Sequence, residues 1–229
     1  MCINFLTVGK KTLEEHFDVL VNSPGEWADE VYQDYPAPII VARRSGQRAV
    51  VAAGYGMVPR RHIPADMKHY STMNARTETI AERPSYALPW QQGQLCLVPM
   101  HAYYEPNWET GSAVRWRIGQ ADAAPFAVAG LYRSWQEADG SRAFSFTQLT
   151  VNADQHPLMK RFHRPEDEKR SLVIIPRAGY DDWLNCRDPR RARAYLQAHP
   201  AEMMMAVPDP KPATAKLQRQ AEDLNGSLF

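Results

Sequence analysis

The chain has 229 residues, and its composition limits the class of protein. Hydrophobic residues make up 44% of the sequence, which is enough for one substantial core, so a single domain is the default expectation. The 27 lysines and arginines almost balance the 26 aspartates and glutamates. This balance excludes a protein that binds nucleic acid through a generally basic surface, so any such site must be a local patch.

The cysteines and prolines narrow the class further. Cys2, Cys96 and Cys186 show no CxxC spacing, so we expect no disulfide framework, no metal site, no cofactor and a reducing cytoplasmic location. The sequence shows no signal-peptide pattern and no run of about 20 apolar residues, the length of a membrane span. The 18 prolines and 12 glycines are spread along the chain, which predicts many short elements joined by turns.

The expected elements, in chain order, are mostly strands. Thr12 and Glu15 form a capping-box pattern that predicts a helix over residues 12–22. Short segments rich in β-branched and aromatic residues predict strands over residues 38–42, 48–53, 95–98, 114–118, 126–131, 144–151 and 172–175. A short helix is expected over residues 181–184, and Asp188 before Pro189 predicts the start of a helix over residues 190–199.

The end of the chain differs from the rest. Prolines at positions 208, 210 and 212 predict a stiff linker. We therefore expect one domain over residues 1–207, followed by a linker and tail over residues 208–229. Residues 213–224 have an amphipathic helical pattern that is too short to be stable in water without a surface to pack on. The domain itself is predicted to be α+β, with a strand-rich core of packed or barrel-like antiparallel sheets and peripheral helices.

Cys2 directly follows Met1, and this position gives it a chemistry that internal cysteines lack. Removal of Met1 would leave a free α-amine and a thiol on one residue. Their reference pKa values, about 7.7–8.0 and about 8.5, let both groups act as nucleophiles near neutral pH. Such a pair traps an aldehyde, because the amine forms a Schiff base and the thiol then closes a thiazolidine ring. Taken alone, a cysteine at position 2 is more often incidental.

Further segments in a fixed order resemble one family. They are the start with Met1, Cys2 and Phe5, the run Asn74–Glu78, the segment Cys96–Glu105, the segment Thr150–Asp154 and the region of His163. In this combination the chain resembles the SRAP family, the SOS-response-associated peptidases, from residue 1 to about residue 207. The resemblance implies the SRAP fold and a covalent reaction of Cys2 with abasic sites in single-stranded DNA.

The resemblance also implies roles for three further residues. Asn74 matches an asparagine that holds the reacting terminus and the opened sugar through its amide; from the residue alone it fits a turn. Glu105 matches a glutamate that moves protons during ring opening and imine formation, and its aromatic neighbours would raise its pKa by desolvation. Without the family, it fits a solvated outer face. His163 matches a histidine that protonates a sugar hydroxyl or helps to reverse the crosslink.

The residues expected to bind DNA are basic or aromatic. Arg76 matches an arginine beside the DNA backbone, and a surface ion pair with Glu78 is the alternative; Glu78 is expected to orient Arg76. One basic cluster follows the turn over residues 54–59 and another surrounds His163, and such charge holds single strands together with aromatic platforms. The remaining candidates of this kind are Arg60, Arg61, Arg164 and Tyr104.

Two departures from the family pattern affect the expected DNA path. The usual glycine-arginine after the cysteine is Ile3 and Asn4 here, which removes an arginine that in the family approaches the DNA backbone. After His163, the familiar arginine-methionine-proline is replaced by a longer stretch over residues 164–171. Phosphate binding near Cys2 is therefore expected to be weaker or to come from Arg60 and Arg61.

Three functions remain open from the sequence. The first is covalent capture of abasic sites in single-stranded DNA, with associated lyase and crosslink-reversal chemistry. The second is a thiol peptidase that uses His163 or Glu105 as its base, although no motif indicates the oxyanion hole that acyl transfer requires. The third is a noncovalent single-strand binder. We expect a monomer that acts in the cytoplasm, associates with the nucleoid when bound to DNA, and has no membrane partner.

Overall fold

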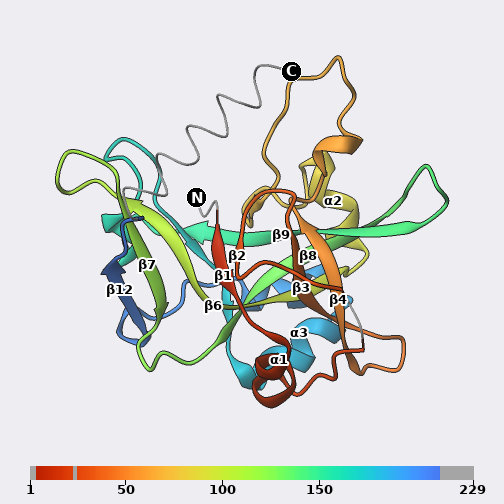
Figure 1. Cartoon of the computed structure of the whole chain (residues 1–229). Coiled ribbons are helices and arrows are strands. Elements are labelled where there is room, and N and C mark those ends of the chain that lie inside the picture. The colour runs from red at the N-terminus through yellow and green to blue at the C-terminus, as the bar shows by residue number, and fades with distance from the viewer. Residues whose placement is uncertain (1–3, 23–24, 212–229) are drawn as a thin grey trace.

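The computed structural model describes residues 4–22 and 25–211, and a closed barrel lies at its centre (Figure 1). The barrel strands are neighbours in the order β8 (Phe126–Gln136), β9 (Arg142–Asn152), β4 (Arg48–Tyr55), β3 (Pro36–Ala42) and β6 (Leu95–Asn107). Because β6 also pairs with β8, the ring closes. Closure leaves no exposed sheet edge in the ring. The predicted strand-rich, barrel-like α+β fold is confirmed.

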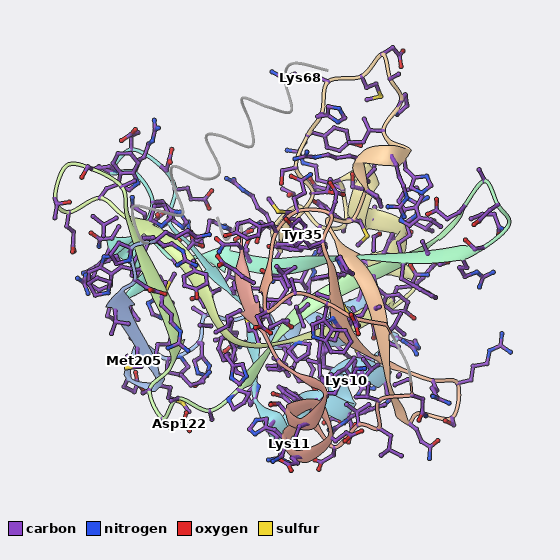
Figure 2. The ribbon with its side chains drawn as sticks, viewed as in Figure 1. Lys10, Lys11, Tyr35, Lys68, Asp122 and Met205 are labelled. Carbon is purple, nitrogen blue, oxygen red and sulfur yellow. The ribbon has the colours of Figure 1, made fainter. Side chains whose placement is uncertain are left out.

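Shorter strands extend this barrel. They are β1 (Phe5–Thr7), β2 (Glu30–Val31), β5 (Asn74–Arg76), β7 (Val114–Gln120), β10 (Arg170–Leu172), β11 (Ile174–Ile175) and β12 (Met204–Pro208). β7 and β12 pair beside the barrel, and Met205 lies exposed on β12 (Figure 2). Not every pairing is antiparallel as expected, since β4 and β5 both run parallel to β9. All predicted strands are present, although the last one is divided into β10 and β11.

The barrel has apolar side chains on both of its faces. Along β6, alternate residues point to opposite sides, so Cys96 and Val98 belong to one core while Leu95 and Leu97 belong to another. The second core contains the buried side chains of α1 (Lys10–Phe17), α2 (Pro84–Gln91) and α3 (Tyr180–Asn185). The helices therefore cover the outer face of the barrel, and Trp183 anchors α3 by donating to the Cys96 carbonyl at 2.9 Å.

The first helix differs from the prediction at both ends. It begins at Lys10 after Gly9, which provides no side-chain cap, so Thr12 lies inside the helix and the predicted capping box is wrong. The helix ends at Phe17 and not at residue 22. Asp18 has φ 52° and stops the helix, because its left-handed backbone cannot continue a right-handed helix.

The last helix starts as predicted but is shorter. Asp188 caps α4 (Pro189–Ala192) by accepting a hydrogen bond from the Arg190 N–H at 2.9 Å. A 3-10 turn over Arg193–Tyr195 follows, so the expected continuation to residue 199 is wrong. Pro208, where the linker was expected to begin, is the last residue of β12 and lies opposite Trp116. The predicted tail helix over residues 213–224 lies outside the described residues.

Candidate functional site

Glu105 and His163, the two predicted proton-transfer residues, are in direct contact. β6 carries Glu105 near its end, and His163 follows the 3-10 turn η2 (Met159–Arg161). Nδ1 of His163 lies 3.4 Å from Oε2 of Glu105. The backbone fixes the two segments together, because the His163 N–H donates to the Pro106 carbonyl at 2.9 Å. His163 has φ 64°, a conformation that costs a non-glycine residue about 1–2 kcal/mol and is kept only where the surroundings impose it.

Burial sets the proton affinities of this pair. The side chains of Glu105 and His163 are only 3% and 5% exposed. Burial raises the pKa of Glu105 to about 7 and lowers the pKa of His163 to about 4. Both shifts favour the neutral forms, so at neutral pH the imidazole is uncharged and Glu105 is close to half-protonated. A carboxyl group that titrates near the working pH can both give and take a proton.

Asn74 and Arg76 lie together at a second cleft. Both belong to β5, so Asn74 lies in a strand and not in a turn. The pairing of β5 with β9 places Asn74 opposite Gln148 and Arg76 opposite Thr150. The backbone carbonyl of Asn74 accepts a hydrogen bond from the Tyr86 hydroxyl at 3.2 Å. The cleft beside these residues has a volume of about 420 Å³, which is enough for part of one nucleotide.

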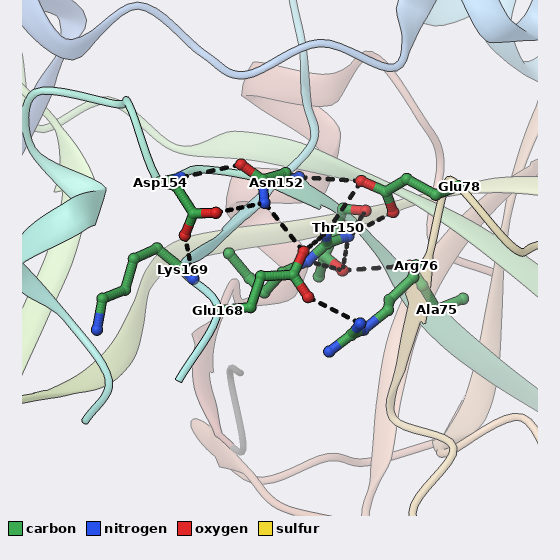
Figure 3. Close-up of polar contacts among 9 residues, drawn as sticks. Ala75, Arg76, Glu78, Thr150, Asn152, Asp154, Glu168 and Lys169 are labelled. Carbon is green, nitrogen blue, oxygen red and sulfur yellow. Dashed lines mark hydrogen bonds and ion pairs between the residues drawn. The ribbon is translucent and has the colours of Figure 1, made fainter. Parts of the chain in front are cut away.

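A buried arginine that no sequence pattern indicated, Arg170, organises the polar network beside Arg76, and Figure 3 shows its partners Glu78, Thr150 and Glu168. Arg170, 2% exposed, donates to both carboxylate oxygens of Glu78 at 2.9 and 2.8 Å and to Glu168 at 2.7 Å. Glu78 therefore binds Arg170, and the expected contact between Glu78 and Arg76 is wrong. Arg76 pairs with Glu168 instead, with 2.7 Å between Nη1 and Oε2. Arg170 follows four charged residues, 166–169, and such a run predicts a solvated loop. The sequence therefore gives no sign that the Arg170 side chain is buried.

Arg60 and Arg61 lie on the 3-10 turn η1 (Arg60–His62), and each pairs with an acidic side chain. The Nε of Arg60 lies 3.3 Å from Oδ2 of Asp34, and Nη2 of Arg61 lies 2.6 Å from Oε1 of Glu137. More than half of each arginine side chain remains exposed. A phosphate would therefore compete with a carboxylate at both positions, and DNA binding by these residues stays a prediction.

Tyr104 and Arg164 occupy different surroundings. Tyr104 is buried, and the Arg115 guanidinium lies 3.4 Å from the centre of its ring, so little of the ring is left for a base to stack on. Arg164 is exposed, and its guanidinium lies 5.1 Å from the centre of the Trp108 ring. Trp108 and His163 line a cleft of about 550 Å³. Arg164 therefore lies beside the cleft into which His163 opens, while a DNA contact by either residue stays a prediction.

Comparison with known proteins decides the family. A family model described as SOS response associated peptidase (SRAP) matches residues 1–210. The chain belongs to the SRAP family. Two relatives from Bacillus subtilis strain 168, the abasic site processing proteins YoqW and YobE, are each 30% identical to it over 140 residues. These matches cover 60% of this chain and 59% and 60% of the relatives, so the chain spans about three fifths of their length.

Solved structures show the same SRAP fold. A protein from Bordetella bronchiseptica superimposes with a TM-score of 0.83 at 30% identity, which covers 92% of this chain and 100% of the other. A protein from Bacteroides thetaiotaomicron superimposes with a TM-score of 0.70 at 20% identity and covers 90% and 91% of the two chains. The barrel and its added strands are therefore the shared framework that carries Glu105 and His163.

Of the expected SRAP nucleophile region, only the part from Asn4 onward belongs to the described residues; Cys2 lies outside them. Asn4 is buried, and its amide donates to Oε1 of Glu30. Its carbonyl accepts a hydrogen bond from the Tyr104 N–H at 3.2 Å. Asn4 therefore fixes the start of the described chain beside β6 at Tyr104, the residue before Glu105. At this position, where the family pattern has an arginine, the chain has a buried neutral side chain.

The other two cysteines are buried free thiols. Burial raises the pKa of the Cys96 thiol, which makes it a poor nucleophile at neutral pH. Within residues 4–22 and 25–211, no three His, Cys, Asp or Glu side chains are grouped so that they could share a metal ion. None of the helices in these same ranges has the length and apolar character needed to cross a bilayer.

Proposed function

We propose that this SRAP protein processes abasic sites in single-stranded DNA and links itself to them through a thiazolidine at Cys2, after Met1 has been removed. The observation that carries the proposal is the buried contact between Glu105 and His163, which joins an acid with a pKa of about 7 to a neutral imidazole. Two relatives are named abasic site processing proteins, which supports the same substrate. The function is therefore proposed as DNA-lesion capture.

Ring opening is the first step that the pair serves. An abasic deoxyribose is a cyclic hemiacetal, and it opens when its C1′ hydroxyl loses a proton while its ring oxygen gains one. Glu105 is close to half-protonated at neutral pH, so both of its forms are available for this exchange. Breaking the bond between C1′ and the ring oxygen then yields a free aldehyde and a C4′ hydroxyl.

Bond formation follows at the chain terminus. The Cys2 amine adds to the aldehyde, and loss of one water, protonated by Glu105, gives an imine. The Cys2 thiol adds to the imine carbon, and its proton passes to the nitrogen, which closes the five-membered ring. The net reaction joins one aldehyde to one aminothiol and releases one water. The low pKa of His163 keeps its imidazole unprotonated, so it contacts Glu105 as a neutral group, and the protons that Glu105 releases pass to water.

Lyase chemistry is a branch of the same intermediate. The imine acidifies the hydrogen at C2′, and a neutral base at this position can remove it, after which the 3′ phosphate leaves by β-elimination. His163 is the neutral base of the site. This lyase branch is slower wherever the thiol closes the ring first.

The remaining residues are proposed to bind the substrate. Asn74 holds the opened sugar, and Tyr104 lies beside Glu105. The arginines proposed to lie along the DNA backbone are Arg76, Arg60, Arg61 and Arg164.

The deciding experiment mixes the full chain with a single-stranded oligonucleotide that bears one abasic site. We expect a shifted band that survives denaturing electrophoresis, and we expect the Cys2→Ala variant to lose it. Cys186→Ala is the matched control, because it removes a free thiol that is buried in the core with the helices, and it should keep the band.

Intact-mass measurement accompanies this experiment. The purified chain should lack the mass of Met1, and the crosslinked species should carry the oligonucleotide mass less one water. A chain that keeps Met1 and still crosslinks, or a shifted band that persists in Cys2→Ala, would contradict the proposal. Turnover of peptide amides without any crosslink would instead support the peptidase alternative.

A further inference from the structure

The loop that precedes β10 carries Glu168, whose carboxylate forms an ion pair with Arg76. This loop belongs to residues 164–171, the stretch in which the chain departs from the family pattern. Its Glu168 side chain lies against Arg76, with 2.7 Å between Oε2 and Nη1 (Figure 3). Arg76 is half exposed and Glu168 is 31% exposed, so the contact is formed at the surface, where a DNA strand could reach it.

Glu168 is held firmly in this position. Its Oε1 accepts hydrogen bonds from Arg170 Nη1 at 2.7 Å and from Asn152 Nδ2 at 3.0 Å. The loop backbone is fixed beside it, because the Lys169 N–H donates to Asp154 at 2.8 Å. With one oxygen anchored in this way, the second oxygen of Glu168 is presented to Arg76 at little further cost in side-chain entropy.

The contact to Arg76 is not needed to hold Arg170. Arg170 already forms two hydrogen bonds with Glu78 and a further one, at 2.6 Å, with the Thr150 carbonyl. Its positive charge is therefore compensated by Glu78, whether or not Arg76 is present. The bond between Glu168 and Arg76 is an additional interaction, and it acts on an arginine whose guanidinium suits a phosphate as well as a carboxylate.

We propose that Glu168 is a built-in competitor for DNA phosphate at Arg76, and that it limits how tightly undamaged single strands are held. This inference rests on the proposed function, because it takes single-stranded DNA as the ligand. A phosphate that binds Arg76 must displace the carboxylate, so each strand loses the energy of one ion pair on binding. Undamaged strands then dissociate readily, whereas a strand with an abasic site is retained by its covalent bond to Cys2.

The test measures equilibrium binding of a fluorescent, undamaged single-stranded oligonucleotide, so that crosslinking plays no part. We expect Glu168→Gln to tighten binding about fivefold, the factor that corresponds to one exposed ion pair. Glu166→Gln is the matched control, because it makes the identical change at an exposed position of the same loop and should alter binding less than twofold by general charge alone. Thermal unfolding of each variant confirms that the fold is kept.

A double-mutant cycle separates competition at Arg76 from a general charge effect. In an Arg76→Ala background, Glu168→Gln should tighten binding no more than Glu166→Gln does. The inference is overturned if Glu168→Gln increases the affinity by the full factor in the absence of Arg76. It is also overturned if the two glutamine variants have the same affinity in the wild-type background. In both cases the protein still binds single strands, so the proposed function is not affected. If no variant binds the undamaged strand at all, although the wild type crosslinks abasic DNA, the inference fails and the lesion-capture proposal survives.

Discussion

Replacement of Glu105 by glutamine should make the protein more stable while it removes crosslinking. The pKa of Glu105 rises from an ordinary value of 4.5 to about 7, because its carboxylate is buried. A tenfold change in proton affinity corresponds to about 1.4 kcal/mol, so keeping this group ionised in the folded state costs about 3 kcal/mol. Glutamine has a similar shape and never ionises, so the variant avoids that cost.

The sign and the pH range of the effect follow from the raised pKa. In the wild type, the contribution of Glu105 to the free energy of unfolding is fully present below about pH 4.5. It falls as the pH rises through 7 and is constant above that range. The Glu105→Gln variant lacks this fall. Urea unfolding should therefore show a difference close to zero near pH 4.5 that grows to about 3 kcal/mol near pH 8.

A second glutamate provides the control for this prediction. Glu109 lies just after β6, is half exposed and pairs with Arg161, and these hydrogen bonds lower its pKa to about 2. Glu109→Gln should slightly reduce stability at neutral pH, the opposite sign. A Glu105→Gln difference that stays flat between pH 4.5 and 8 would refute the view of Glu105 as a buried acid with a raised pKa.

Three further variants test the structure by urea unfolding at neutral pH. Arg170→Ala should lower the free energy of unfolding by about 2–3 kcal/mol, because it leaves Glu78 and Glu168 without their shared cation. A loss no larger than that of an ordinary surface substitution would show that Arg170 does not organise this network. Gly130→Ala should lose about 1–3 kcal/mol, because its Cβ would lie 2.8 Å from both Cys96 Sγ and the Thr147 carbonyl, whereas Gly54→Ala, with no such atom closer than 3.8 Å, should change little. Asp188→Ala should lose about 1 kcal/mol with the cap of α4, and an unchanged midpoint would show that the cap is dispensable.

The strands could be predicted from the sequence because their signals are local. Runs such as Leu95–Val98 are apolar on successive residues, and the structure shows why, since both faces of β6 are buried. The helix ends were harder, because they depend on backbone geometry. Asp18 ends α1 through its left-handed conformation, and nothing about an aspartate between Phe17 and Val19 indicates that in advance.

The site shows the same division between local and tertiary signals. The resemblance indicated Glu105 and His163, and the structure places them in contact. It could not indicate the partners of Arg76, because Glu168 and Arg170 are distant in sequence and reach β5 only through the pairing of β9 with β5 and β10. Glu78 is a natural candidate for an ion pair because it is only two positions from Arg76, but β5 ends at Arg76 and Glu78 lies in the turn that follows, where it binds Arg170.

The pairing of β1 with β6 also has a consequence for the order of events during synthesis. Phe5 lies opposite Tyr103, so the start of the chain cannot take its final place until the ribosome has made roughly a hundred further residues. At about 5–20 residues per second, this delay lasts about 5–20 seconds. During that interval β1 can pair with β2 but not with β6, so on the proposed function there is time for Met1 to be removed before the barrel closes.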